Sequence, residues 1–228
     1  MTGLPIPLLM ESDDTTPFPP VHTAMNEPNG LLMAGANLKP ERLLSAYRQG
    51  IFPWYSEGEP ILWWSPNPRC IIWPDQLKIS RSLRKVIKKQ MYKISHSQAF
   101  RSVVEACGAP RDDSQGTWIT GDMINAYCQL AKAGHAESIE IWQDDELVGG
   151  LYGVVVGRIF VGESMFSKRS DASKIALVAL AGGGRFDMID CQLPTQHLLS
   201  MGAVNIDRED YLQVLQRLGR QTNSKFPQ

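Results

Sequence analysis

Residues 138–165 read SIEIWQDDELVGGLYGVVVGRIFVGESM, and this stretch decides the fold. It holds three runs rich in apolar and β-branched residues, separated by polar or glycine-containing turns. Such runs predict strands, and short turns between them join strands in antiparallel pairs. The sequence therefore predicts an antiparallel meander with strands at Ser138–Trp142, Leu147–Val156 and Arg158–Met165 and turns at Gln143–Glu146 and Gly157.

Helical segments lie on both sides of this meander in the chain. Periodicity and capping residues predict a helix from near Pro40 to Gly50 and further helices over Ser82–Gln90, Ser97–Ala106, Asp122–Lys132, Asp171–Leu180, Gln196–Met201 and Arg208–Leu218. Met188–Cys191 predicts one more strand. A meander followed by helix, strand and helix is typical of the α+β class with a mostly antiparallel sheet.

The N-terminal part of the chain differs in composition from the rest. Residues 1–30 are rich in proline and should run extended, and residues 52–66 combine prolines with tryptophan and tyrosine. With 228 residues, the chain is long enough for a large domain and a small additional lobe. We expect an N-terminal lobe over residues 1–67 and the main domain over residues 68–228.

Net charge, apolar runs and cysteine spacing indicate where the protein is located and whether it binds a metal. The formal net charge is −1, and the sequence shows neither a basic signal-peptide start nor an apolar run long enough for a membrane span. The four cysteines lie far apart without CxxC spacing, which favours free thiols in a reducing compartment over disulfides. The sequence therefore predicts a cytoplasmic protein without a metal site.

Two short strings place carboxylates at the polar ends of predicted strands: Gly162–Ser167 and, further on, Asp190-Cys191-Gln192. Because residues two apart share a face of a strand, Asp190 and Gln192 should point the same way. An acid beside an amide, with Glu163 nearby, suits the handling of an amine, since a carboxylate can orient an ammonium group or take its proton. A strand-end hydrogen bond is the alternative for Asp190. For Glu163 the apolar setting favours function, because an unpaired buried acid is costly.

A basic helix face lies between Asp75 and Glu105, where no acidic residue occurs. Five cations there follow helical spacing on one side, and we call them the basic stripe: Arg81, Arg84, Lys85, Lys88 and Lys89. Like charges at this spacing repel each other, and a few phosphates of a single-stranded RNA end or stem edge would relieve the repulsion. A solvated lysine-rich face is the alternative.

Tryptophans are concentrated just after the predicted first helix. Most of them fit a small lobe packed with indoles, but an aromatic wall can also stack on a nucleobase or surround an apolar side chain. Trp54, which ends a Gly-Ile-Phe-Pro turn, and Trp118, just before a predicted helix, are the candidates for lining a pocket.

Common catalytic and nucleotide-binding motifs are missing from the sequence. It contains no Gly-x-Ser-x-Gly, HExxH, GxxxxGKS/T or GxGxxG, and its four histidines are scattered. The meander and following helix suggest an acetyltransferase-like sheet, yet residues 167–174 lack the glycines that would let backbone amides close around the pyrophosphate of coenzyme A. An acyl donor that arrives already activated, as an aminoacyl ester on a tRNA end, fits the stripe, the aromatics and the acids together.

Eight strings occur in order over roughly residues 28–215: Gly-Ile-Phe-Pro-Trp-Tyr, Ile-Leu-Trp-Trp-Ser-Pro-Asn-Pro-Arg, Ser-Arg-Ser-Leu-Arg-Lys, Thr-Trp-Ile-Thr, Leu-Val-Gly-Gly-Leu-Tyr-Gly, Gly-Glu-Ser-Met-Phe-Ser, Ala-Ser-Lys and Ile-Asp-Cys-Gln. In this order they resemble the leucyl/phenylalanyl-tRNA–protein transferase family of bacteria. The resemblance implies transfer of Leu or Phe, and Met less well, from aminoacyl-tRNA to the α-amine of proteins with N-terminal Arg or Lys. The product is marked for degradation.

The resemblance also implies a fold and a site. The fold is a small N-terminal lobe plus an acetyltransferase-like domain, and no cofactor or metal is used. Asp190 and Gln192 would handle protons with help from Glu163, and the basic stripe would hold the tRNA acceptor end. The aminoacyl group would be bound by Tyr47, Trp54, Trp118, Tyr127, Phe160, Met165 and Ser167.

The chain departs from the family pattern in three places. Gly35-Ala36-Asn37-Leu38 stands where Gly-Gly-Asp-Leu is usual, Glu137 replaces a histidine, and the segment from Lys174 to Asp190 is shorter and contains three consecutive glycines. Two other hypotheses stay open on the sequence. One is a module that binds the tRNA acceptor end without activity, and the other is a peptidoglycan-bridge type of aminoacyl-tRNA-dependent transferase.

Overall fold

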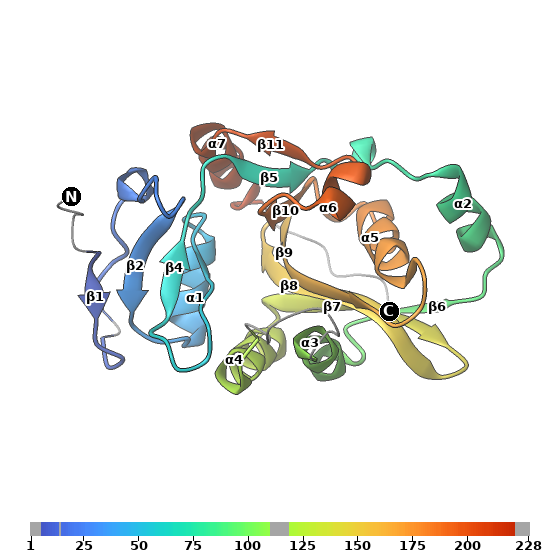
Figure 1. The fold of residues 1–228 in the computed structure, drawn as a ribbon, viewed down its shortest axis with the longest axis horizontal. Coiled ribbons are helices and arrows are strands. Elements are labelled where there is room, and N and C mark those ends of the chain that lie inside the picture. Colours follow the sequence, from blue (N-terminus) through green and yellow to red (C-terminus); the bar gives the residue numbers. More distant parts are fainter. Residues whose placement is uncertain (1–5, 14, 110–118, 222–228) are drawn as a thin grey trace.

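The computed structural model describes residues 6–13, 15–109 and 119–221, and the strands in these ranges form two sheets (Figure 1). The larger sheet has the strand order β11-β5-β10-β9-β8-β7-β6. Its strands are β5 (Arg69–Ile72), β6 (Lys93–His96), β7 (Ala136–Gln143), β8 (Glu146–Val156), β9 (Ile159–Ser167), β10 (Met188–Gln192) and β11 (Val204–Ile206). All neighbours in this sheet pair antiparallel except β9 and β10, which pair in parallel.

The smaller sheet belongs to the N-terminal part of the chain. Its order is β1-β2-β4-β3, and β1 pairs in parallel with β2 while the other pairs are antiparallel. The strands are β1 (Leu8–Leu9), β2 (Leu31–Gly35), β3 (Phe52–Pro53) and β4 (Leu62–Trp64). The protein is thus of the mixed α+β class, with an N-terminal domain and mixed sheets.

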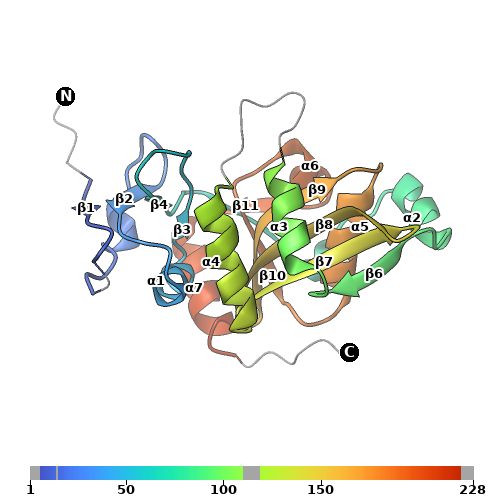
Figure 2. The same cartoon turned by 90° about the horizontal axis from the view of Figure 1, so that it is seen from below.

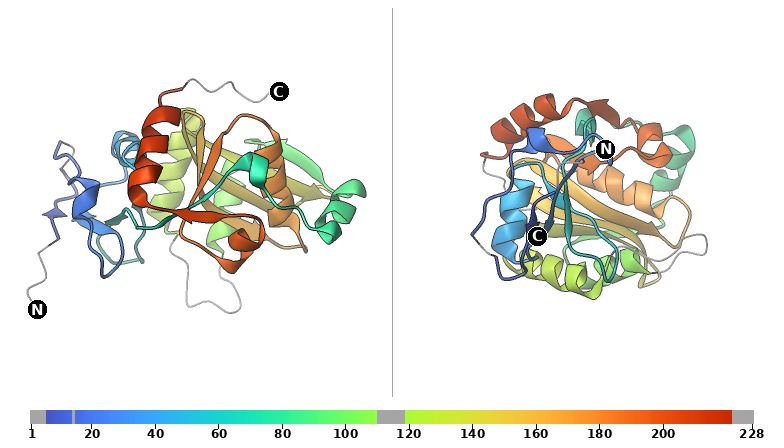
Figure 3. Two further views of the ribbon diagram at one scale, coloured as in Figure 1. Left: turned by 90° about the horizontal axis from the view of Figure 1, so that it is seen from above. Right: turned by 60° about the vertical axis from the view of Figure 1, so that its left-hand side comes forward.

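Helices cover both faces of the larger sheet. The helices of the described chain are α1 (Pro40–Tyr47), in the N-terminal part, and α2 (Arg81–Lys88), α3 (Phe100–Gly108), α4 (Gly121–Lys132), α5 (Ala172–Gly182), α6 (Gln196–Ser200) and α7 (Arg208–Leu218), with 3-10 turns at Val21–Thr23 and Pro74–Gln76. Figure 2 shows α3 and α4 side by side across one face, and the right-hand view of Figure 3 shows the sheet between α4 and α5. Within the described ranges, every helix is too short or too polar to cross a bilayer.

Alternation along the meander explains the two layers. Tyr152 packs against the rings of Tyr127 of α4 and Phe100 of α3, with ring centres 5.4 and 5.8 Å away. Its neighbour Leu151 belongs to the other buried cluster, which includes Ile175 of α5. Successive side chains of a strand point to opposite faces, so a strand that is apolar on both faces needs a helix on each side. The long apolar strand β8 therefore lies buried between two helical layers.

The predicted meander and the predicted helices are confirmed, with shifts of a few residues at their ends. The largest shifts are three residues: α1 ends at Tyr47 rather than Gly50, and α3 begins at Phe100 rather than Ser97. Ser97 has φ of +51°, a left-handed conformation that cannot continue a helix. The short strands β5, β6 and β11 were not predicted, because three or four residues give little periodicity and their partners are distant in sequence.

The segment from Lys174 to Asp190 is shorter than usual, yet β10 pairs with both of its neighbours in the sheet. Helix α5 runs to Gly182, and Gly184, with φ of +67°, makes the turn that follows. The next residue, Arg185, donates two hydrogen bonds to Glu137 on β7, one of them at 2.9 Å. The acid at the position of the usual histidine is therefore held by an ion pair.

A glycine in β8 sets how closely α5 approaches the sheet. A Cβ at Gly149 would lie 2.5 Å from the Cβ of Ala172 and 3.1 Å from its carbonyl carbon. Overpacking of this kind costs about 1–3 kcal/mol, so G149A should lower the free energy of unfolding by that amount. At Gly182 an added Cβ would meet nothing within 4 Å, and G182A should leave stability unchanged or raise it. Urea unfolding of both variants checks this, and equal losses would contradict it.

Candidate active site

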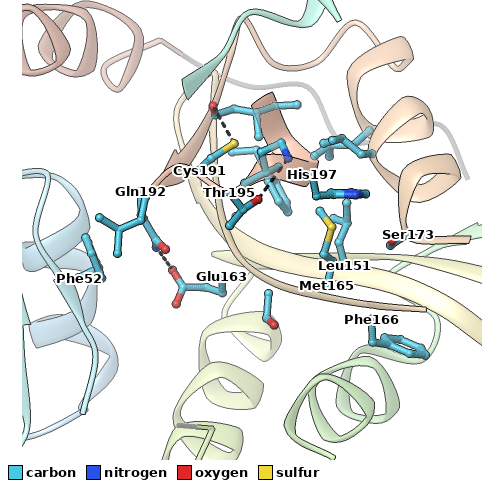
Figure 4. Close-up of a pocket in the computed structure, with 18 of the residues that line it drawn as sticks. Phe52, Leu151, Glu163, Met165, Phe166, Ser173, Cys191, Gln192, Thr195 and His197 are labelled. Atoms are coloured by element: carbon cyan, nitrogen blue, oxygen red, sulfur yellow. Dashed lines mark hydrogen bonds between the residues drawn. The ribbon is translucent and has the colours of Figure 1, made fainter. Parts of the chain in front are cut away.

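A cavity of about 690 Å³ opens between the large sheet, α5 and α6 (Figure 4). Strands β8, β9 and β10 supply one side of it, and Phe52 of the small lobe lies at the end next to Glu163. Pro53 and Trp54 also belong to the lining. Its lining is mainly apolar and includes Leu151, Phe160, Met165, Leu177, Leu180, Ile189 and Leu198. A cavity of this size and character suits an apolar group of a small ligand.

Glu163 on β9 is a buried acid at the wall of this cavity, with 8% of its surface exposed. Tyr127 donates its hydroxyl to Oε2 at 2.6 Å, and Gln192 donates its side-chain amide to Oε1 at 2.9 Å. Behind them, the hydroxyls of Tyr47 and Tyr127 lie 2.5 Å apart. Desolvation raises the pKa of Glu163 to about 7, because it outweighs the hydrogen bonds, and the charge of Asp190 adds to the increase. A carboxyl with this pKa can both accept and donate a proton near neutral pH.

Asp190 is fully buried and is not among the residues that line the cavity. Arg69 donates Nε to Oδ1 and Nη2 to Oδ2, both at 2.8 Å. Tyr211 donates its hydroxyl to Oδ2 at 2.7 Å, and the backbone N–H of Gln192 donates to Oδ1 at 2.9 Å. The carboxylate therefore faces the protein interior. Its part in proton handling stays a prediction.

Gln192 does not follow the alternation of a regular strand. The register with β5 shifts between Asp190 and Gln192, and Gln192 has φ of +61°. A bulge of this kind turns a side chain to a new direction. The expectation that Asp190 and Gln192 point the same way is therefore wrong. Asp190 turns to Arg69. Figure 4 shows Gln192 turned toward Glu163. The bulge still brings the three predicted residues into one network, because Gln192 bonds to both acids.

Arg69 and Tyr211 were not predicted as site residues. The guanidinium of Arg69 lies 4.9 Å from the ring centre of Phe52 and 4.6 Å from that of Tyr211, and its Nη1 donates to the carbonyl of Gly50 at 3.1 Å. One available signal was a cation at the start of the apolar string Arg-Cys-Ile-Ile. A charge in such a string needs a buried partner. Tyr211 carries no comparable local signal.

The other predicted substrate-binding residues fall into two groups. Four of them line the cavity: Trp54, Phe160, Met165 and Ser167. Tyr47 and Tyr127, by contrast, are fully buried and are not part of the lining, and their hydroxyls extend the hydrogen-bond network behind Glu163. Trp118 lies outside the described residues.

His197 on α6 adds a polar group to the cavity wall. Its Nε2 is buried and makes no hydrogen bond to any residue in the described part of the chain. Desolvation lowers the pKa of His197, and the charge of Lys174 lowers it further. The imidazole is therefore neutral at neutral pH.

The basic stripe lies on α2, and all five of its residues are exposed. Leu83 on the opposite side of the helix is buried, and Val86 and Ile87 pack against the same apolar cluster as α5. The hydroxyl of Ser80 caps the helix by accepting the N–H of Leu83 at 3.2 Å. In Figure 1 α2 lies at the end of the molecule away from the small lobe, with α5 between it and α6.

Comparison with known proteins gives consistent matches. A family model described as leucyl/phenylalanyl-tRNA protein transferase matches residues 71–216, and the model of that family's N-terminal domain matches residues 36–67. A leucyl/phenylalanyl-tRNA–protein transferase of Nitrosomonas europaea is 57% identical over 206 residues, which cover 89% of this chain and 87% of that protein. One of Pseudomonas putida is 52% identical over 214 residues, covering 92% and 95%.

Among solved structures, L-PGS from Bacillus licheniformis is similar with a TM-score of 0.40 and 12% identity, over 72% of this chain and 53% of that one. The family models and the close relatives define the class of the protein, which is an aminoacyltransferase. Their coverage and identity also decide the family, and the chain belongs to the leucyl/phenylalanyl-tRNA–protein transferase family. The resemblance noted in the sequence is thereby confirmed.

The raised pKa of Glu163 makes stability depend on pH. Its pKa is about 7 in the fold against a usual 4.5, so the folded state binds the proton more tightly than the unfolded chain. The stability gained from Glu163 is fully present below its pKa in the unfolded chain. It is lost as the pH rises through its pKa in the folded state. E163Q should therefore gain free energy of unfolding relative to wild type between about pH 5 and about pH 8, by on the order of 3 kcal/mol.

Urea unfolding at several pH values measures this difference. Glu105→Gln, at an exposed site on α3, is the control and should change the pH dependence much less. A constant difference between E163Q and wild type over this pH range would contradict the raised pKa.

Proposed function

We propose that this protein transfers Leu or Phe, and Met less well, from aminoacyl-tRNA to the α-amine of proteins that begin with Arg or Lys, and so marks them for degradation. The observation that carries the proposal is a buried carboxyl at the wall of an apolar cavity. Glu163 lies in the same lining as Leu151 and Met165. An aliphatic or aromatic aminoacyl side chain would fill the apolar part, and its ester carbonyl would lie near Glu163 and Gln192.

The reaction exchanges an ester for an amide. The lone pair of the neutral α-amine attacks the ester carbonyl, the C–N bond forms, and the ribose oxygen of the tRNA leaves. Because an α-amine has a pKa near ~8, it must first give up a proton. Glu163, with a pKa of about 7, is matched to this task, since proton transfer from the ammonium group is only slightly uphill. The acid so formed can return the proton to the ribose oxygen, which restores the carboxylate. The second proton that the nitrogen loses as the amide forms goes to water.

Gln192 and Asp190 support this step in different ways. The amide of Gln192 donates to Glu163 and fixes the orientation of its carboxylate beside the cavity. Asp190 has no place in the cavity lining, so its effect on transfer passes through the backbone of Gln192 or through its charge, which contributes to the raised pKa of Glu163. We therefore assign the proton to Glu163 and a supporting part to Asp190.

Two surfaces suit the tRNA. The basic stripe on α2 presents five exposed cations to the phosphates of the acceptor end. Trp54 is 42% exposed next to the cavity, and the indole of Trp64 lies 5.6 Å from it. An exposed indole in this position can stack on the terminal adenine. Adenine on Trp54 and phosphates on α2 would orient the ester toward Glu163.

We also propose the division into a lobe of residues 1–67 and a catalytic domain of residues 68–228. The smaller sheet, within residues 8–64, and the larger one, within residues 69–206, support it. The meander followed by α5 supports an acetyltransferase-like catalytic domain. The site of action is the cytoplasm, where aminoacyl-tRNA is present and where the buried thiols of Cys70, Cys107 and Cys128 stay reduced.

The transfer reaction is tested directly with purified protein. Wild type should move labelled leucine from Leu-tRNA to a peptide that begins with Arg, without an added cofactor, and should leave the same peptide with an acetylated N-terminus unlabelled. E163Q removes the proton acceptor and should lower kcat about 100-fold while still binding Leu-tRNA. Binding without transfer by wild type would favour the tRNA-binding module, and labelling of lysine side chains alone would favour the bridge enzyme.

The basic stripe is tested by a matched pair of charge reversals. K85E on α2 should raise KM for Leu-tRNA about fivefold and lower the slope of log KM against log salt by about 0.7, because one phosphate contact is lost. K132E, at the end of α4 on the other face of the sheet, should leave both unchanged. Steady-state kinetics at several salt concentrations measure these values. Equal effects of the two variants would mean that general charge, not the stripe, attracts the tRNA.

A further inference from the structure

Two buried side chains have no part in the reaction as described so far: Arg69 on β5 and Tyr211 on α7. Together with Asp190 they form what we call the Asp190 cluster. Each oxygen of the carboxylate receives two hydrogen bonds in it. Oδ1 accepts from Arg69 and from the backbone of Gln192, and Oδ2 accepts from Arg69 and Tyr211.

Stability alone does not account for this cluster. The side chains of Arg69 and Asp190 are 1% and 0% exposed. Taking two charges out of water costs several kcal/mol per ion, and apolar residues of the same volume are often at least as stabilising. A buried ion pair is therefore better explained by the geometry that it fixes.

The geometry fixed here is the backbone at Gln192. A φ of +61° is unfavourable for a residue with a side chain, by roughly 1–2 kcal/mol. The hydrogen bond from the N–H of Gln192 to Asp190 Oδ1, at 2.9 Å, holds this conformation. In the same conformation the side chain of Gln192 reaches Glu163.

The cluster also reaches the small lobe. Arg69 donates to the carbonyl of Gly50 and lies against the ring of Phe52, which lines the cavity. Gly50 has φ of +74°, and a Cβ there would lie 2.8 Å from the ring of Tyr211. One set of contacts therefore joins the lobe, α7 and the bulge of β10.

We propose that Arg69 and Tyr211 are positioning residues for aminoacyl transfer, which act through Asp190 to hold Gln192 against Glu163. This inference rests on the proposed function. Neither residue is part of the cavity lining, so both act on the step that needs Glu163 aligned and not on the binding of aminoacyl-tRNA. Loss of either contact lowers kcat and leaves KM for the tRNA unchanged.

Y211F is the first test, because it removes one hydroxyl and keeps the ring. It should lower kcat about tenfold, the effect of losing a hydrogen bond to a charged group. The matched control is Y152F. Tyr152 is equally buried, but its hydroxyl makes no hydrogen bond to any described residue, so kcat should stay at the wild-type value.

R69K is the second test, and it should lower kcat more than Y211F because lysine cannot donate two hydrogen bonds in a fork.

A double-mutant comparison separates positioning from general destabilisation. If Tyr211 acts through Gln192, Y211F should lower kcat in wild type and hardly at all in a Q192A background. The same fractional loss in both backgrounds would overturn the proposal. So would a rise in KM for Leu-tRNA with kcat unchanged.

A readout without catalysis keeps this inference separate from the proposed function. Hydrogen exchange of the segment 188–193, followed by mass spectrometry, reports on the N–H of Gln192. Y211F should speed this exchange relative to wild type and Y152F. If wild type transfers no leucine, the proposed function fails, and the exchange still decides the part of the cluster. Unchanged exchange in Y211F would overturn the proposal.

Discussion

The buried ion pair between Arg69 and Asp190 is the interaction on which the arrangement of the site depends. It joins β5 to β10 through two hydrogen bonds of 2.8 Å, and it takes α7 into the same contact through Tyr211. Asp190 also accepts a hydrogen bond from the backbone N–H of Gln192, where a bulge interrupts β10. Because a charge buried without its partner costs several kcal/mol, these elements are constrained to one relative position.

Two acids with similar burial have different chemistry here because their partners differ. Asp190 is paired with the guanidinium of Arg69. Among the described residues, the hydrogen-bond donors to Glu163 are neutral: the hydroxyls of Tyr127 and Tyr47 and the side-chain amide of Gln192. Neutral donors do not offset the loss of solvent, and the pKa of Glu163 rises to about 7. The fold thus pairs one carboxylate with a buried cation and leaves the other able to exchange protons beside an apolar cavity.

The sequence predicted the parts of the fold that local pattern determines. The meander of β7, β8 and β9 and the helices follow from periodicity, which each segment carries within itself. It also predicted Glu163, Asp190 and Gln192 as neighbours, and the structure joins them in one hydrogen-bond network. Their directions could not be predicted, because the bulge at Gln192 depends on Asp190 and, through it, on Arg69, which is 121 positions away from Asp190 in the chain.

The position of Tyr211 on α7 has a consequence for biosynthesis. A ribosome makes the chain from its N-terminus, so Arg69 and Asp190 are synthesised before α7 (Arg208–Leu218). Until that helix docks, the carboxylate of Asp190 lacks one of its hydrogen-bond donors and one side of the ion pair is open to water. Nascent chains would therefore complete the hydrogen bonds around Asp190 only after α7 has been made and has docked, which delays activity until that helix is in place.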